Sequence, residues 1–294
     1  MKKKNLITQA ALIVICTILG IFILYPFLLV VAASFSDERD ILATGYKLIP
    51  KHFTWAAYEY VFKNPATLLR AYKVTTVFSV AATVLSVFFM SLLAYPLTKT
   101  DLKGRNVINF YIYFTMLFGG GLVPEYILNT QYLHIGNTIW VYILPGLISP
   151  WYTFMIRTFF KDIPNEICES ALIDGAGEYM IFFKMIIPLS KPVIAAVSLF
   201  TFLARWNSWY PSLLYIDNPK LYSLQYLLQI MLKNIESMLD VSNSNVAVDV
   251  NLANIPAETV RMAMAVLVAG PALVIFPFFQ KYFVKGLTVG SVKG

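Results

Sequence analysis

The most informative part of the chain reads ESALIDGAGEYMIFFKMIIPLSKP, from Glu169 to Pro192. An acidic first half leads into Asp174-Gly175-Ala176-Gly177, a run that favours a turn because glycine adopts positive φ without strain. After the turn, apolar residues recur at the spacing of one helical face, at Tyr179, Phe182, Phe183 and Ile186. The pattern predicts two short helices joined by a glycine-containing turn.

Long apolar segments lie on both sides of this stretch. Of 294 residues, 58% are hydrophobic and only 13% are charged, and the mean hydropathy is +0.66. Soluble domains carry about 25% charged residues. Residues 5–36, 74–98 and 262–280 contain no Asp, Glu, Lys or Arg. Because a spanning helix needs about 20 apolar residues, the composition predicts a membrane protein rather than a soluble domain with a large core.

We therefore predict an all-α integral membrane protein with one transmembrane domain over residues 1–294. Six spans are expected, at about 8–34, 74–98, 107–128, 138–160, 192–216 and 260–282. The apolar run after the basic N-terminus is too long for the core of a cleaved signal peptide, so we expect a retained first span. Prolines and glycines predict breaks in three spans, or simple kinks, at Gly119–Gly121, Pro145, Pro150, Pro271 and Pro277.

The distribution of basic residues predicts the orientation. With the N-terminus inside, the inner segments hold 13 Lys and Arg in 61 positions, and the outer loops hold 9 in 100. Both termini are therefore expected in the cytoplasm, although the first outer loop, 37–73, alone holds six. The loop 161–191 then faces the cytoplasm, and a longer polar loop, 217–258, faces outward. The net charge of +7 largely reflects the inner loops and requires no nucleic-acid partner.

The cytoplasmic loop has two interpretations. It can rest on the lipid surface as an interfacial helix, or it can dock into a groove on another protein. Interfacial helices are usually rich in Lys and Arg, whereas this loop carries Glu169, Asp174 and Glu178, which we expect to face water. Its acidic character favours docking.

The same segment resembles the EAA loop of binding-protein-dependent ABC importer permeases. The matching residues are Glu169-Ser170-Ala171, Asp174-Gly175-Ala176 and Ile186-Ile187-Pro188, with Ser170 and Met185 as mild departures. Further segments resemble carbohydrate-uptake permeases, most closely the MalG-like subunits that serve oligosaccharides and polysaccharide fragments; they are 118–128, 157–167, 206–215 and 286–294. The resemblance implies the fold of a type I ABC importer permease with six transmembrane helices and a cytoplasmic coupling loop.

The resemblance also implies roles for particular residues. Glu169 would be the charged contact with a cytoplasmic ATPase, and Gly175 would permit the turn. The rest of the docking surface would comprise Ser170, Ala171, Asp174, Ala176, Phe182, Phe183 and Pro188. In the C-terminal tail, Gly290 and Lys293 would contact the ATPase subunits.

The implied assembly contains a second permease subunit, two ATPase subunits and an extracytoplasmic solute-binding protein in a bacterial cell membrane. This chain has no G-x-x-x-x-G-K-[ST] stretch, so ATP and Mg would be bound by the partner ATPase, and the chain itself is not expected to be an enzyme or to hold a cofactor or metal. The expected substrate is an oligosaccharide or polysaccharide fragment, with acidic sugars as one option. An importer of amino acids or peptides is the alternative.

Candidate substrate contacts lie at the end of the fifth predicted span, where Arg205 is a charge within an apolar segment. Arg205 can face the pathway and favour an acidic sugar, pair with a partner's acid, or lie in water near a helix break. The neighbouring Trp206, Asn207, Trp209 and Tyr210 can contact sugar rings, although the aromatic residues are also typical of an interfacial belt. The polar segment Ser242–Ile255 is either a solvated connection or, as the resemblance implies, a loop that inserts into the binding protein and helps to eject the sugar.

Overall fold

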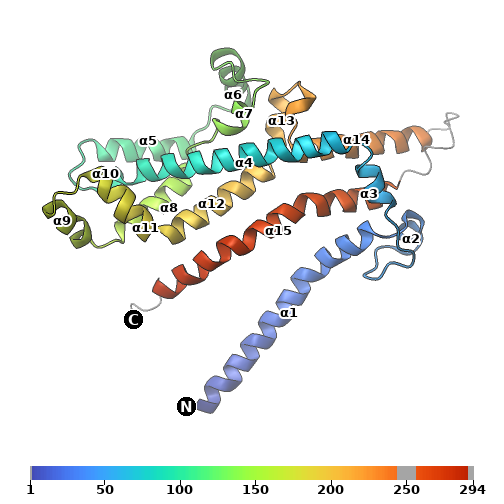
Figure 1. Ribbon diagram of the computed structural model, residues 1–294, viewed down its shortest axis with the longest axis horizontal. Coiled ribbons are helices and arrows are strands. Elements are labelled where there is room, and N and C mark those ends of the chain that lie inside the picture. Colours follow the sequence, from blue (N-terminus) through green and yellow to red (C-terminus); the bar gives the residue numbers. More distant parts are fainter. Residues whose placement is uncertain (1, 244–255, 291–294) are drawn as a thin grey trace. The chain divides into compact units, whose positions relative to one another are not determined.

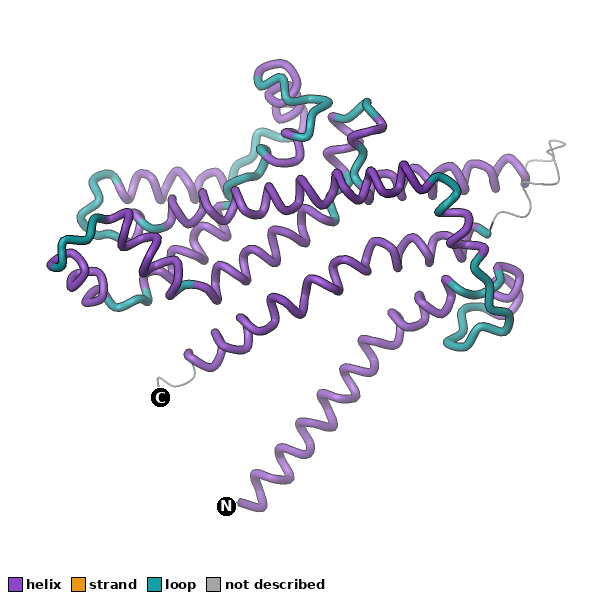
Figure 2. The backbone as a smooth tube through the Cα atoms, in the orientation of Figure 1, coloured by secondary structure: helices purple, strands orange, loops and turns teal. Residues whose placement is uncertain are grey.

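Helices make up the chain in the computed structural model, which describes the backbone of residues 2–243 and 256–290 and the side chains of residues 9–237 and 256–277. Within those ranges the backbone forms no strand (Figure 2). A single antiparallel bridge joins Ser36 and Phe53. The all-α prediction is therefore confirmed for the described residues.

The chain divides into two compact units, which are described one at a time. The first comprises residues 1–68 and 228–271, and the second comprises residues 69–227 and 272–294. The first unit contains α1 (Lys2–Ser34), α2 (Glu38–Thr44), α3 (Ala56–Val61), most of α14 (Leu224–Asn243) and the beginning of α15 (Ala257–Gly290).

A carboxylate from α2 caps the first turn of α15 within the first unit. Glu38 accepts hydrogen bonds from the backbone N–H groups of Glu258 and Thr259 and from the Thr259 hydroxyl, each at 2.9 Å. The first N–H groups of a helix have no partner inside the helix, and a negative charge favours the positive end of its dipole. Arg261 then bridges Glu258 and Glu236, at 3.3 and 3.0 Å. These contacts hold the start of α15 against α2 and α14.

The second unit is a bundle of helices built around α4 (Figure 1). In chain order its elements are α4 (Pro65–Ala94), η1 (Pro96–Thr98), α5 (Arg105–Leu117), α6 (Leu122–Ile127), η2 (Leu128–Tyr132), α7 (Trp140–Ile143), α8 (Pro150–Lys161), α9 (Asn165–Ile173), α10 (Glu178–Ile181), η3 (Phe182–Ile186), α11 (Ile187–Leu189), α12 (Lys191–Trp206), α13 (Tyr210–Tyr215) and η4 (Pro219–Leu221).

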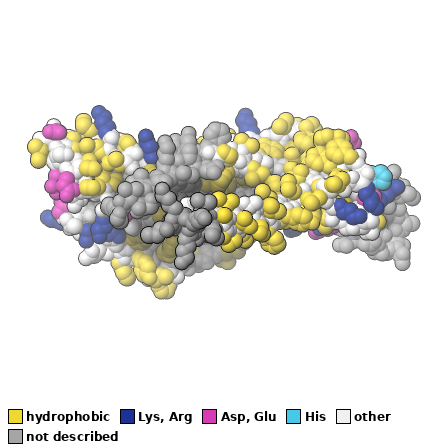
Figure 3. Space-filling model, turned by 90° about the horizontal axis from the view of Figure 1, so that it is seen from below, with side chains coloured by type: hydrophobic (Ala, Val, Ile, Leu, Met, Phe, Trp, Pro, Cys, Tyr) yellow, Lys and Arg dark blue, Asp and Glu magenta, His cyan; other side chains and the backbone are white. Residues whose placement is uncertain are grey.

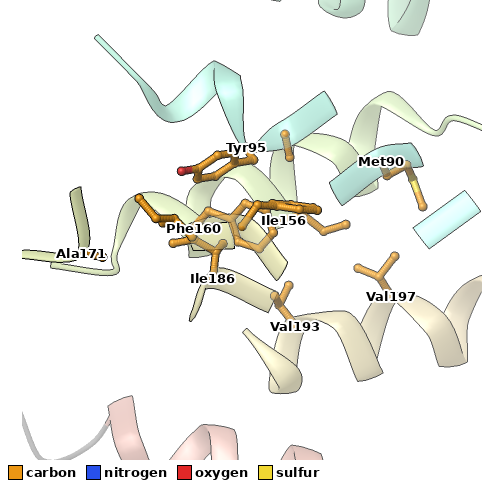
Figure 4. Close-up of a cluster of buried hydrophobic side chains, with 11 residues drawn as sticks. Met90, Tyr95, Ile156, Phe160, Ala171, Ile186, Val193 and Val197 are labelled. Atoms are coloured by element: carbon orange, nitrogen blue, oxygen red, sulfur yellow. The ribbon is translucent and has the colours of Figure 1, made fainter. Parts of the chain in front are cut away.

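The core of this unit joins the C-terminal end of α4 to α8, α9 and α12. Figure 4 shows the side chains of Met90, Tyr95, Ile156, Phe160 and Val197 gathered between these helices. Ile156 and Val197 are fully buried and lie within this cluster. A second cluster lies around Phe78 and Tyr142, whose rings stack with centroids 4.4 Å apart.

Three helical segments are long and apolar enough to cross a membrane: Gln9–Ser34, Pro65–Thr98 and Ala257–Pro277. Two bent pairs, Arg105–Leu117 with Leu122–Tyr132 and Glu178–Leu189 with Lys191–Trp206, raise the number to five if each pair is one span. These counts rest on length and composition within the described residues. The structure therefore supports a multi-span protein, and its helices do not reproduce the six predicted spans one for one.

The predicted break in the third span is confirmed. Helix α5 ends at Leu117, residues 118–121 are not helical, and α6 leaves at 110° to α5. Gly121 has φ +86°, a conformation that favours glycine. The chain therefore turns sharply at the Gly119–Gly121 run.

The predicted fourth span, 138–160, is interrupted at one of its two predicted proline positions. Residues 144–149 separate the one-turn helix α7 from α8, so neither helix alone is long enough to cross. Pro145 lies in this break and Gly146 adopts φ +66°, whereas Pro150 starts α8 at a position where its missing N–H costs nothing. No break occurs at Pro271 or Pro277, because α15 continues through both residues, so of the two alternatives only simple kinks stay open there.

Candidate functional site: the loop between α8 and α12

The first helix of the loop, α9, begins directly after Pro164 and ends at Ile173. Proline has no backbone N–H, so it suits a helix start, where that group would lack an intrahelical partner. Glu166 lies in the first turn and complements the positive end of the helix dipole. The sequence prediction of a short acidic helix here is confirmed by the structure.

The turn after α9 is a Schellman motif. The N–H of Ala176 donates to the carbonyl of Ala171 at 2.9 Å, and the N–H of Gly175 donates to the carbonyl of Leu172 at 3.0 Å. This geometry requires the left-handed conformation that Gly175 adopts, with φ +85°. Gly177 lies at φ −75° and has no such requirement. Gly175 is thus the glycine that the turn needs.

The second helix of the loop changes its winding. After α10, residues Phe182–Ile186 form one π-helical turn (η3), which shifts the face that later residues present. Ile181, Phe182 and Ile186 are buried, whereas Tyr179 is 78% exposed and Phe183 is 50% exposed. The predicted apolar face of Tyr179, Phe182, Phe183 and Ile186 is therefore wrong for Tyr179 and Phe183.

The outer surface of the loop combines acidic and apolar side chains. Glu169, Ser170, Asp174 and Pro188 are exposed. Ala171 is buried and Ala176 is half-buried, so these two alanines pack inside the loop. The large apolar side chains exposed beside the acids belong to Leu172, Ile173, Tyr179, Met180 and Phe183. Charged side chains gather at the α9 end of this unit, at the left of Figure 3.

A short polar network ties the loop to the end of α4. The Tyr95 hydroxyl donates to one oxygen of the Glu178 carboxylate, and the Lys99 ammonium donates to the other at 3.2 Å. The Tyr95 ring also packs on Phe182, with centroids 5.3 Å apart. Sequence reasoning missed Tyr95 and Lys99, because nothing in their local pattern indicates a partner 83 or 79 residues away. Movement of the loop must therefore move α4 or break these bonds.

The space between the loop and residues 95–101 is a cavity of about 410 Å³. The charged residues of its lining are Lys99, Asp101, Lys161, Glu169 and Glu178. Glu169 therefore borders an opening large enough to admit a side chain from another protein.

Arg205 binds backbone carbonyls of the break between α7 and α8. Its guanidinium donates to the carbonyls of Tyr142, Pro145 and Gly146, at 3.3, 2.9 and 2.8 Å. Carbonyls freed by a helix break at membrane depth need such partners. The sequence left three positions open for Arg205, and the structure places its side chain beside a helix break.

The four other candidate substrate contacts, which follow Arg205 in the sequence, lie in different environments. Trp206 is buried beside Phe202 and Tyr72, so its ring is covered within this unit. Asn207 is exposed and accepts a hydrogen bond from Gln225 at 3.0 Å. Trp209 and Tyr210 are partly exposed and meet edge to face. They remain able to contact a ligand, and the sequence grouping of all four residues does not describe one surface.

The tail and the outer loop are described only in part. Gly290 ends α15, and Lys293 lies outside the described residues. Most of the Ser242–Ile255 segment, residues 244–255, also lies outside them. The roles suggested for these residues stay predictions.

Comparison with known proteins defines the class. Residues 11–289 match the family described as binding-protein-dependent transport system inner membrane component, and the chain belongs to this family. Its relatives include permease subunits of oligosaccharide and polysaccharide ABC importers, which are not themselves enzymes.

Three similar proteins illustrate the relationship. Protein LplC of Bacillus subtilis (strain 168) is 38% identical, over 95% of this chain and 94% of that protein. The polygalacturonan/rhamnogalacturonan transport system permease protein YtcP of the same organism is 36% identical, over 92% of each chain. In a solved bacterial ABC transporter involved in the import of the acidic polysaccharide alginate, one chain is 26% identical, with a TM-score of 0.76, over 95% of this chain and 98% of that chain. The resemblance inferred from the sequence is thereby confirmed.

Proposed function

We propose that this chain forms half of the translocation pathway of an ATP-driven importer of oligosaccharides or polysaccharide fragments. The named activities of its relatives support the substrate class, including an acidic polysaccharide for the solved transporter. The amino-acid or peptide alternative has no such support among these relatives.

The assembly we propose contains a second permease subunit, two ATPase subunits that hold ATP and Mg, and an extracytoplasmic solute-binding protein. The chain crosses a bacterial cell membrane six times, with both termini in the cytoplasm. In this arrangement the loop 161–191 reaches the ATPase, and Gly290 and Lys293 lie near the ATPase subunits. Binding of ATP moves the loop, and the spans then alternate between two states of access.

One observation carries the coupling role: the loop is firmly attached on one side and exposed on the other. Its attachment consists of the Glu178 bonds to Tyr95 and Lys99 and the packing of Tyr95 on Phe182. Its exposed side holds Glu169, Ile173 and Tyr179, which the rest of the described chain leaves uncovered. An acidic side chain at the mouth of a cavity suits a basic residue of the ATPase.

The test is a charge reversal, Glu169→Lys, in the complete complex. We expect sugar uptake to fall at least about tenfold, because a broken charge pair at an interface costs about 2–5 kcal/mol. The amount of protein in the membrane should stay unchanged. Uptake by proteoliposomes, together with ATPase stimulation by the loaded binding protein, measures the effect.

Glu59→Lys is the matched control, since Glu59 is an exposed acid on α3 and lies outside the loop. It should transport normally. Normal transport by Glu169→Lys, or equal loss in both variants, would contradict the coupling role. Uptake of peptides without uptake of any oligosaccharide would instead support the alternative substrate class.

A further inference from the structure

Two arginines lie side by side within the second unit, where η1, α5 and α8 meet. On α8, the Nε–H of Arg157 donates to the carbonyl of Leu97 at 3.0 Å. Arg105, the first residue of α5, donates through Nη1 to the carbonyl of Lys99 at 3.3 Å. The two carbonyls are only two residues apart, and the charge of Arg105 acts on the guanidinium of Arg157. Two half-buried positive charges therefore share one small region.

Neither of these charges is neutralised by a described side chain. The ion pairs of the described residues are formed elsewhere, and Asp101 and Asp162, the acids nearest to the two arginines in the sequence, lie beyond ion-pair distance of both. A guanidinium stays protonated in proteins, so the two like charges repel each other unless an anion lies close to both. The pair therefore favours an anionic partner from outside the chain.

Arginines commonly bind the last carbonyls of a helix, and that role occupies only part of each side chain here. A guanidinium has five N–H donors. Arg157 bonds through Nε and keeps Nη1 and Nη2, whereas Arg105 bonds through Nη1 and keeps Nε and Nη2. Each arginine thus retains two neighbouring nitrogens, which is the arrangement that binds two oxygens of a phosphate.

The surroundings of the pair combine positive charge with apolar surface. No side chain caps the first turn of α5, so the positive end of its dipole adds to the two guanidinium groups. Directly beyond, Val107, Phe110 and Tyr111 on α5 are 72%, 67% and 67% exposed. The carbonyl that Arg157 binds lies at the end of Pro65–Thr98, a segment long enough to cross a membrane. A basic site beside apolar surface at the end of a span has the properties of a phospholipid site.

We propose that Arg105 and Arg157 together bind the phosphate of an anionic phospholipid, whose acyl chains lie along the exposed face of α5. A phosphate ion from solution offers the same oxygens but gains nothing from the apolar surface beside them. In the proposed topology the lipid belongs to the cytoplasmic leaflet. The site bears on coupling, because Arg105 holds the backbone of Lys99, whose ammonium binds Glu178 of the loop. The inference requires a chain embedded in a membrane and no particular transported substrate.

Photolabelling of the complete complex in phosphatidylcholine vesicles tests the site. The probes are trace amounts of phosphatidylglycerol or phosphatidylcholine that carry the same photoreactive group in one acyl chain, and mass spectrometry locates the labelled residues. We expect phosphatidylglycerol to label residues 107–118 at least about fivefold more than phosphatidylcholine does, since even one basic residue near a membrane surface attracts anionic lipid on that scale. Equal labelling by the two probes would overturn the site.

Three variants that each remove one positive charge distinguish a site from general surface charge. Lys103→Gln is the matched control, because Lys103 is an exposed basic residue two positions before Arg105. Arg105→Gln and Arg157→Gln should each lower the preference for phosphatidylglycerol at least about threefold more than Lys103→Gln does. An equal fall in all three variants would overturn the site. Thermal unfolding in phosphatidylcholine alone identifies a variant that fails to fold, and Arg105→Gln, whose carbonyl bond is the longer one, then carries the comparison.

Inorganic phosphate separates the lipid from a phosphate ion in solution. The preference for phosphatidylglycerol should persist in sodium phosphate, as in sodium chloride of the same ionic strength. If phosphate abolishes the preference and chloride does not, the site takes free phosphate and the lipid assignment is overturned. Loss of the preference in both salts would show screening of general surface charge and would also overturn the site.

Discussion

At the scale of single residues, Gly175 has the backbone conformation that most restricts the residue type in the loop between α8 and α12. Its φ of +85° lies in the left-handed region, which costs a residue with a β-carbon about 1–2 kcal/mol. A side chain there would meet no atom within 4 Å, so the cost comes from the backbone alone. A β-carbon at Gly177 would also meet no atom within 4 Å, and the φ of Gly177 is one that any residue adopts.

We therefore expect Gly175→Val to lower the stability of the turn by about 1–2 kcal/mol and to reduce coupled uptake. Gly177→Ala should behave like the wild type, since alanine fits its conformation and its space. Thermal unfolding of the purified complex and sugar uptake measure the two effects. Identical behaviour of the two variants would show that the turn does not depend on the left-handed residue.

The sequence indicated which residues matter, such as Gly175 and Arg205, but it did not predict which groups Arg205 contacts. The run Asp174-Gly175-Ala176-Gly177 by itself indicated the turn around Gly175, because turn chemistry is local. Arg205 was noticed as a charge in an apolar segment, but its carbonyl partners lie 59–63 residues away. Long-range hydrogen bonds leave no local pattern, so the sequence left three roles for Arg205 open.

At the scale of elements, two features attach the loop to the end of α4. Glu178 bonds to Tyr95 and Lys99, and Phe182, in the π-helical turn Phe182–Ile186, packs on Tyr95. The sequence predicted an ordinary helix here, because hydrophobic spacing reports the period of a regular helix only. Ile181 is buried and Tyr179 is exposed, whereas the sequence placed Tyr179 on the apolar face. The glycine run after α5 was easier to interpret, since consecutive glycines directly disfavour a helix.

The Glu178 contacts give the element-scale prediction. Glu178→Gln removes the charge that binds Lys99 and weakens the bond from Tyr95, so the loop should transmit less of its movement to α4. We expect ATP hydrolysis to continue while sugar imported per ATP falls about threefold to tenfold, as for a loss of about 0.7–1.4 kcal/mol.

Tyr95→Phe should give a similar loss, and the double variant should lose little more than either single variant, because the two residues share one interaction. Glu166→Gln is the control, since Glu166 is exposed on α9 and Gln keeps its shape. Strictly additive losses from Tyr95→Phe and Glu178→Gln would mean that the two residues act separately.

At the scale of the whole molecule, composition was a sound guide to class and a poor guide to the number of spans. The uncharged runs 5–36, 74–98 and 262–280 each coincide with a helix long enough to cross. The segments between them contain Gly and Pro and form short helices joined at sharp angles. Hydropathy averages over such breaks, so it cannot distinguish one long span from two short helices.

The proposed topology can be tested with single cysteines in a chain whose Cys16 and Cys168 are replaced by serine. A membrane-impermeant maleimide should label Lys51→Cys and Asp217→Cys in intact cells. It should label Asp101→Cys and Lys161→Cys only after the membrane is permeabilised. All four positions are exposed in the structure, so accessibility within the chain does not limit the reaction. Labelling of Lys161→Cys in intact cells would reverse the orientation.

The carbonyl contacts of Arg205 also bear on the order in which the protein matures. In the proposed six-span topology, Tyr142, Pro145 and Gly146 enter the bilayer before the side chain that binds their carbonyls has been made. Lipid offers these groups no hydrogen bond. In that topology the region before α8 stays incomplete until α12 arrives, so a chain truncated between α8 and α12 should leave these carbonyls unpaired.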